Sequence, residues 1–190
     1  MAILATLAST LIMVEIIRTS AEGRTKMPLV DTSQSWQLVR TYLRVLFVTI
    51  VSLLPVLIFG TYAFSKVLFN EMSPLTAGAG ILAALAFAAL YYPACLATVA
   101  VWDSVLDSLN PMYVARVIRT IGVDYFVVVA VWFVATAATT LLSSPWISPT
   151  MMIPIAGGII GRFLSFWSLF YVSHLLGYAV YRHARELGWE

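Results

Sequence analysis

The sequence predicts an all-α integral membrane protein with about five transmembrane helices and two short cytoplasmic interfacial amphipathic helices. Three observations support this fold class. The 190 residues are 61% hydrophobic and 11% charged, whereas a soluble domain is about half apolar and a quarter charged. The apolar residues gather in five long runs. Nine of the eleven Lys and Arg residues lie in three polar connectors that alternate with these runs.

The five apolar runs are the predicted spans, at roughly Ala2–Ile17, Val45–Phe69, Thr76–Trp102, Tyr125–Leu142 and Ile155–Val180. A spanning helix needs about 20 apolar residues. The second, third and fifth runs meet this length and the fourth meets it narrowly. The first run is short, and we expect it to be tilted, shallow or re-entrant. The runs are continuously apolar and do not alternate with polar residues, which favours helices over the strands of a barrel.

The basic residues predict the orientation of these spans. The first and third connectors and the C-terminal tail are basic: Arg18, Arg24, Lys26, Arg40, Arg44, Arg116, Arg119, Arg182 and Arg185. The second connector has only Lys66, balanced by Glu71, and the fourth has no basic residue. Because basic residues near helix ends stay in the cytoplasm, we expect the N-terminus outside and the C-terminus in the cytoplasm. The first run has no basic residues before it, unlike a signal peptide, and is interpreted as a retained anchor.

Two basic connectors have the periodicity of amphipathic helices. In Trp36–Arg44 and in Met112–Ile121, apolar residues recur on one helical face and arginines on the other. Helices of this kind lie in the membrane interface, with their basic side chains at anionic headgroups. The predicted headgroup-binding residues are Arg40, Arg44, Arg116 and Arg119.

The chain is expected to form a single membrane domain over residues 1–190. The similar connectors suggest two parallel repeat units, residues 1–70 and 75–143, followed by an extra span at 151–181. The alternative is that any cytoplasmic connector between apolar runs tends to be basic and amphipathic.

Two groups of residues resemble a known family. One is Glu22-Gly23-x-x-x-Met27-Pro28-Leu29 before a basic helix and a Leu53-Leu54-Pro55 span. The other is Leu109-Asn110-Pro111-x-x-x-x-Arg116-Val117-Ile118-Arg119-x-x-Gly122-x-Asp124-Tyr125. Over most of its length the chain resembles a family of polytopic prokaryotic membrane proteins known only as a domain of unknown function. The resemblance implies a helical fold in a prokaryotic cytoplasmic (inner) membrane, and it implies no functional residues.

Arg162, His174 and Glu15 lie within apolar runs, where ionisable residues often mark functional sites. Arg162 is interpreted either as a cation held in a bundle cavity or as a side chain that extends to the outer interface. His174 is interpreted as a hydrogen-bonded packing residue or as a proton relay. Glu15 lies three residues before Arg18, a spacing that favours a local ion pair over proton coupling.

The sequence shows no catalytic or metal-binding motif and no cofactor is expected. Its one cysteine, Cys95, excludes a disulfide framework, and a net charge of +2 is too small to indicate nucleic acid. We therefore predict a non-enzymatic protein, either an accessory subunit of a larger membrane complex or a lipid-interacting scaffold. Its expected partners are membrane lipids and other membrane subunits or further copies. The alternative is a small oligomeric transporter or channel that uses Arg162 or His174.

Overall fold

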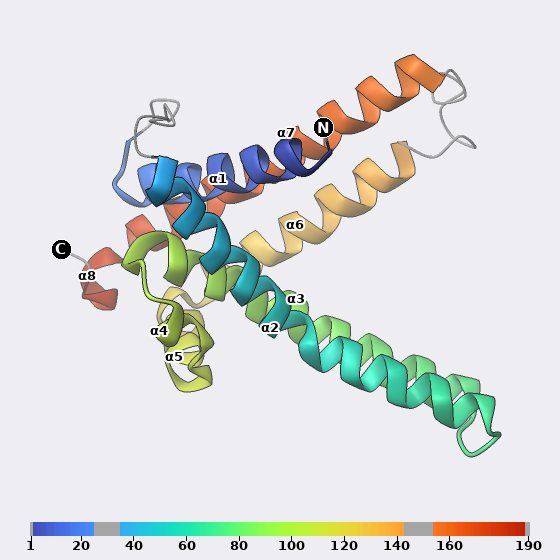
Figure 1. Cartoon of the computed structure of the whole chain (residues 1–190). Helices are drawn as coiled ribbons and strands as arrows, with labels where there is room; N and C mark the ends of the chain where they lie inside the picture. Colours follow the sequence, from blue (N-terminus) through green and yellow to red (C-terminus); the bar gives the residue numbers. More distant parts are fainter. Residues whose placement is uncertain (1, 25–34, 143–153, 189–190) are drawn as a thin grey trace. The chain divides into compact units, whose positions relative to one another are not determined.

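The computed structural model describes residues 2–24, 35–142 and 154–188, except the side chains of residues 2–7, 35, 154–159 and 162. Every regular element in these ranges is a helix (Figure 1). The helices are α1 (Ala2–Ala21), α2 (Ser35–Leu68), α3 (Pro74–Trp102), α4 (Val105–Leu109), α5 (Pro111–Ile121), α6 (Val123–Leu142), α7 (Pro154–Arg182) and α8 (Ala184–Leu187).

Four helices of the described part are long and apolar enough to cross a membrane. They are Trp36–Leu68 of α2, Pro74–Trp102 of α3, Val123–Leu142 of α6 and Phe163–Arg182 of α7. These four coincide with four of the five predicted runs and confirm an all-helical membrane protein. The first run forms α1, but the side chains of its first residues lie outside the described part of the chain, so its depth stays a prediction.

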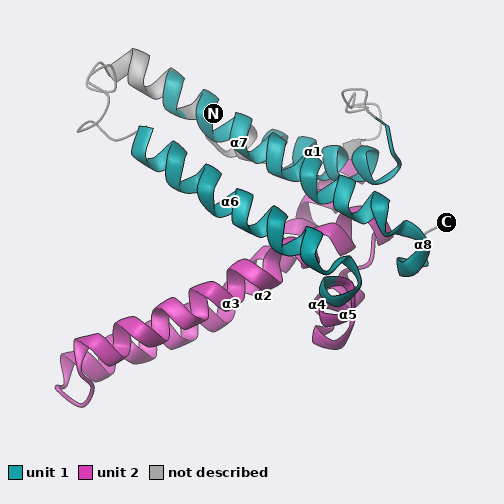
Figure 2. Cartoon of the chain, turned by 180° about the vertical axis from the view of Figure 1, so that it is seen from behind, with its two compact units in different colours: residues 1–34, 118–190 teal, residues 35–117 magenta. Residues whose placement is uncertain are grey.

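The helices fall into two compact units, which Figure 2 colours separately. Unit 1 contains α1, α6, α7 and α8, and unit 2 contains α2, α3 and α4. The division between the units falls within α5, after Val117. The proposed repeat of 1–70 and 75–143 stays a prediction.

In unit 2, α2 and α3 pack side by side as a long hairpin (Figure 1). A turn with Asn70 in the left-handed conformation (φ 57°) joins them. Ser73 then caps α3, because its hydroxyl accepts a hydrogen bond from the backbone nitrogen of Thr76 at 3.2 Å. Pro74 follows at the first helical position, where a missing N–H costs nothing.

One predicted detail of unit 2 differs from the structure. Trp36–Arg44 is not a separate interfacial helix, because α2 runs without interruption from Ser35 to Leu68. No glycine or proline lies between Ser35 and Pro55, so nothing in the sequence ends the helix there. Its 34 residues extend about 51 Å, well beyond the roughly 30 Å of a bilayer core. The amphipathic stretch is therefore the first part of α2.

In unit 1, α7 packs against both α1 and α6. Gly122 connects α5 to α6 with a positive φ of 60°, which suits glycine. Helix α7 ends at Arg182, and the short helix α8 follows almost directly after it. Because α6 packs against α7, the start of α6 and the end of α7 lie together within this unit.

Candidate functional site

The predicted headgroup residue Arg44 forms an ion pair with Asp103 in unit 2. Asp103 ends α3 in the left-handed conformation (φ 54°), and its backbone N–H binds the Val99 carbonyl. Only 20% of the Arg44 side chain is exposed, compared with 53% of the Asp103 side chain. Arg44 therefore connects α2 to the end of α3 within the protein. Arg40, one turn earlier, is exposed.

Helix α5 is the second amphipathic helix, and it forms where the sequence predicts it. Asn110 precedes Pro111 and its side-chain oxygen accepts a hydrogen bond from the backbone nitrogen of Met112 at 3.0 Å. One face of α5 is buried through Val114, Val117 and Ile121. Arg116 and Arg119 are exposed, and no acidic residue occurs in the helix.

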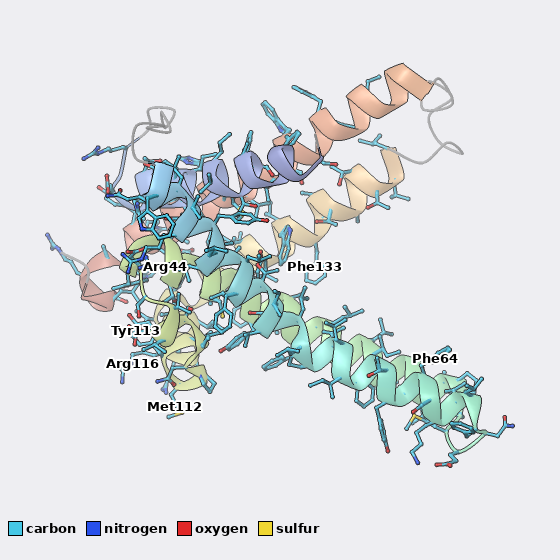
Figure 3. The ribbon with its side chains drawn as sticks, in the orientation of Figure 1. Arg44, Phe64, Met112, Tyr113, Arg116 and Phe133 are labelled. Atoms are coloured by element: carbon cyan, nitrogen blue, oxygen red, sulfur yellow. The ribbon has the colours of Figure 1, made fainter. Side chains whose placement is uncertain are left out.

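Large apolar side chains are also exposed in α5 and in the short helix before it. Met112 is 79% exposed and Leu106 of α4 is 83% exposed. Figure 3 shows Met112 and Arg116 extending from the same helix. A large apolar side chain and two arginines are therefore exposed on the same short helix.

Tyr113 fixes the start of α5 to the end of α3. Its ring packs edge-on against Trp102, with 6.1 Å between ring centroids. Burial raises the pKa of the Tyr113 phenol above its usual value. The negative charge of Asp107 raises this pKa further and the positive charge of Arg116 lowers it. The phenol is therefore neutral at physiological pH, and α5 is held to α3 by ring packing.

Polar side chains link the helices of unit 2 farther along the hairpin. The Thr49 hydroxyl donates to the Val45 carbonyl at 2.8 Å and to the Tyr92 hydroxyl at 3.3 Å. The Tyr91 hydroxyl donates to the Leu109 carbonyl at 3.1 Å. These bonds join α2 to α3 and α3 to the end of α4, and so position the segment that carries α5.

A charged cluster joins the start of α6 to the end of α7 in unit 1. Arg182 Nη1 donates to Asp124 Oδ2 at 2.9 Å. His183 Nε2 lies 3.3 Å from the same oxygen, and His183 Nδ1 lies 3.4 Å from Glu186 Oε2. The sequence predicts Asp124 at a helix N-terminus, where a carboxylate is favourable, and Asp124 does lie in the first turn of α6. The sequence does not predict that Arg182 and His183 are its partners.

The intramembrane candidates have different surroundings. Glu15 Oε2 lies 3.9 Å from Arg18 Nη1, which is the local pair expected from their spacing. His174 Nδ1 shares a hydrogen bond of 2.6 Å with Ser20 Oγ, and so links α7 to α1. The Arg162 side chain lies outside the described residues, so both interpretations of it remain open. A role of Arg162 or His174 in transport stays a prediction.

Helices α1 and α7 approach each other closely at Gly177, a contact that the sequence does not predict. A Cβ atom at this position would meet the Ile17 carbonyl oxygen and would lie 2.6 Å from Ser20 Cβ. Ser173, one turn earlier, is also buried. The spacing Ser173-x-x-x-Gly177 is the small-residue pattern that lets membrane helices approach closely, and it is the signal that could have located this contact.

Comparison with known proteins identifies a family but no activity. A family model described as "Protein of unknown function (DUF4013)" matches residues 1–148. The match therefore includes α1 to α6 and ends before α7. No curated protein and no solved structure matches the chain. Since residues 1–148 are more than half of the 190, the chain belongs to the DUF4013 family of proteins of unknown function.

Proposed function

We propose that this protein is a non-enzymatic membrane scaffold that binds anionic phospholipid headgroups through the exposed arginines of α5 and of the first part of α2. The observation that supports this most is the composition of α5. Arg116 and Arg119 are exposed, the opposite face is buried, and the helix has no acidic residue. A lipid surface is the partner that matches this charge. Because basic residues near helix ends stay in the cytoplasm, the proposal assigns α5 to the cytoplasmic leaflet of a prokaryotic inner membrane.

Electrostatics sets the size of the expected effect. Each basic residue close to an anionic bilayer contributes about 1 kcal/mol. Arg116 and Arg119 together would then contribute about 2 kcal/mol, which corresponds to about a 30-fold preference for anionic lipid. Arg40 would add to this preference. Arg44 would add less, because Asp103 already neutralises its charge.

The scaffold would also contact other membrane helices. Within the four candidate spans, the buried share ranges from 17% to 33%, so most of each helix surface is open to lipid or to further subunits. Exposed large apolar residues occur along all four, for example Phe64 on α2, Phe87 on α3, Phe133 on α6 and Trp167 on α7. These surfaces support an accessory-subunit role. A stable monomer that co-purifies with no other protein would contradict that role and leave the lipid role standing.

The lipid role is tested by counting retained lipids. The full chain is placed in nanodiscs with equal parts of phosphatidylglycerol and phosphatidylcholine of matched acyl chains, transferred to mild detergent and studied by native mass spectrometry. We expect retained phosphatidylglycerol to exceed phosphatidylcholine, and Arg116→Gln with Arg119→Gln to reduce this excess. A matched control compares two single substitutions that each remove one positive charge. Arg119→Gln removes it from α5, and Lys66→Gln removes it near the turn after α2, where Lys66 pairs with Glu71.

Three outcomes decide the proposal. Restoration of the excess by Arg116→Lys with Arg119→Lys supports a role of positive charge. Equal retention of both lipids by the unsubstituted protein contradicts the proposal, and so does an equal effect of Lys66→Gln and Arg119→Gln.

A further inference from the structure

A polar cavity of about 670 Å³ lies at the end of α7 in unit 1. Its walls include Glu22, just after α1, together with Tyr181, Arg182, Arg185 and Glu186. Its size is within the range of small-molecule sites. Two arginines, two glutamates and a phenol can bind a ligand that carries both a negative and a positive group.

The position of this cavity along the span indicates the level of the membrane at which it lies. The apolar part of α7 runs from Phe163 to Arg182, and α1 ends at Ala21, next to Glu22. The candidate span of α7 therefore ends where the cavity begins, beside the end of α1. A polar cavity at this level faces the headgroups of the bilayer.

A second, smaller cavity lies between α6 and α7. It measures about 160 Å³. Its walls are Asp124, Val127 and Val128 of α6 and Leu175, Tyr178, Ala179 and Arg182 of α7. The ion pair of Asp124 with Arg182 lies among these walls, and Arg182 also lines the polar cavity. The two cavities thus share Arg182. A polar cavity next to an apolar groove is complementary to a phospholipid, whose headgroup and acyl chain need these two environments.

We infer that the two cavities bind a phospholipid with a primary-amine headgroup of the phosphoethanolamine type. Arg182, Arg185 and the Tyr181 hydroxyl donate to the phosphate. Glu22 and Glu186 accept hydrogen bonds from the ammonium group, and the groove between α6 and α7 holds the start of an acyl chain.

The existing ion pairs orient these groups and leave them able to bind more. Arg182 uses Nη1 toward Asp124, and a guanidinium has five N–H donors. Glu22 and Glu186 use Oε2 toward Arg24 and His183, and a carboxylate accepts through both oxygens. Gly23 approaches the Tyr181 ring so closely that a Cβ atom would lie 2.7 Å from its Cε2. This contact positions the phenol at the cavity.

The same geometry predicts which headgroup is preferred. A primary ammonium donates three hydrogen bonds, whereas the trimethylammonium of phosphatidylcholine donates none. Hydrogen bonds to charged acceptors are stronger than those between neutral groups, so we expect at least about a tenfold preference for phosphatidylethanolamine over phosphatidylcholine.

The test uses the full chain in nanodiscs of equal parts phosphatidylethanolamine and phosphatidylcholine with identical acyl chains, followed by native mass spectrometry in mild detergent. Glu186→Gln should lower the ratio of retained phosphatidylethanolamine to phosphatidylcholine by at least about threefold. Its matched control is Glu71→Gln, which removes an exposed carboxylate in unit 2 and should leave the ratio unchanged. Circular dichroism confirms that both variants keep their helix content.

Equal retention of the two lipids by the unsubstituted protein overturns the inference, as does an equal effect of Glu186→Gln and Glu71→Gln. A further experiment measures the binding of water-soluble glycerophosphoethanolamine, which has the headgroup but no acyl chain. If it binds as tightly as the lipid, the apolar groove holds no acyl chain and the phospholipid assignment fails. Neither result depends on the retention of phosphatidylglycerol by α5, so this site and the proposed function can fail separately.

Discussion

Arg44 in the first part of α2 pairs with Asp103, the left-handed residue that ends α3. The pair holds together the end of the α2–α3 hairpin that is distant from the turn at Asn70. It also gives Arg44 a partner within the protein, while Arg40, Arg116 and Arg119 are exposed. The four arginines predicted to bind headgroups therefore have different surroundings.

The first prediction concerns this ion pair. In a double-mutant cycle with Arg44→Gln and Asp103→Asn, the coupling free energy should be about 0.5–1 kcal/mol, because one partner is half exposed and water screens the pair. Asparagine also tolerates the left-handed conformation, so Asp103→Asn removes the charge without straining the backbone. Unfolding by detergent titration measures the four stabilities. A coupling energy of zero would show that the pair does not hold the hairpin.

The second prediction concerns the contact of α1 with α7. Gly177→Ala should reduce the free energy of unfolding by about 1–3 kcal/mol, because the added methyl group meets the backbone of α1 at Ile17 and the side chain of Ser20. The matched control is Gly60→Ala in α2, where a Cβ atom meets nothing within 4 Å. This control should be neutral or should stabilise by up to about 1 kcal/mol. Equal effects of the two substitutions would contradict the close approach.

The third prediction concerns the cluster at Asp124. Asp124→Asn weakens the interactions with Arg182 and His183. It should reduce the free energy of unfolding by only about 0.5–1 kcal/mol, because Arg182 is more than half exposed. Hydrogen exchange should become faster in the first turn of α6 and at the end of α7. Exchange in α2 and α3 should not change. Unchanged exchange at the start of α6 would mean that the cluster does not hold these helix ends together.

The fourth prediction concerns the pH dependence of Tyr113. Burial is the largest cause of its raised pKa, and the negative charge of Asp107 is the second largest. Because the pKa is higher in the folded protein, the stability that it contributes is present below the ordinary tyrosine value of about 10 and is lost as pH rises through the folded value. The difference in near-ultraviolet titration between the unsubstituted protein and Tyr113→Phe gives this pKa. Asp107→Asn should lower it; an unchanged or higher value would contradict the assigned cause.

Local sequence patterns were enough to predict the four long apolar helices and α5, but not the short helices α4 and α8. Hydrophobic length identified the spans that form α2, α3, α6 and α7, and the periodicity after Asn110 identified α5. The separate helix at Trp36–Arg44 was not found, because amphipathicity shows which face is polar but not where a helix ends. Glycine and proline are the sequence signals that can mark an end, and none precedes Pro55 in α2.

The partners of the charged residues could not be predicted in the same way. Arg182 and Asp124 are 58 residues apart in sequence, and their meeting depends on how α6 and α7 pack. Glu15 and Arg18 were predictable because three residues on one helix place them on one face. The contact at Gly177 depends on tertiary packing as well, although its spacing from Ser173 was visible.

The position of α5 at the bilayer interface is the central claim, and the depth of Met112 tests it most directly. In a Cys95→Ser background, Met112→Cys is labelled with an environment-sensitive fluorophore in nanodiscs with and without phosphatidylglycerol. We expect blue-shifted emission, quenching by lipids spin-labelled near the headgroup, and a larger effect with phosphatidylglycerol that Arg116→Gln with Arg119→Gln reduces. A water-exposed label that is insensitive to phosphatidylglycerol would contradict the account.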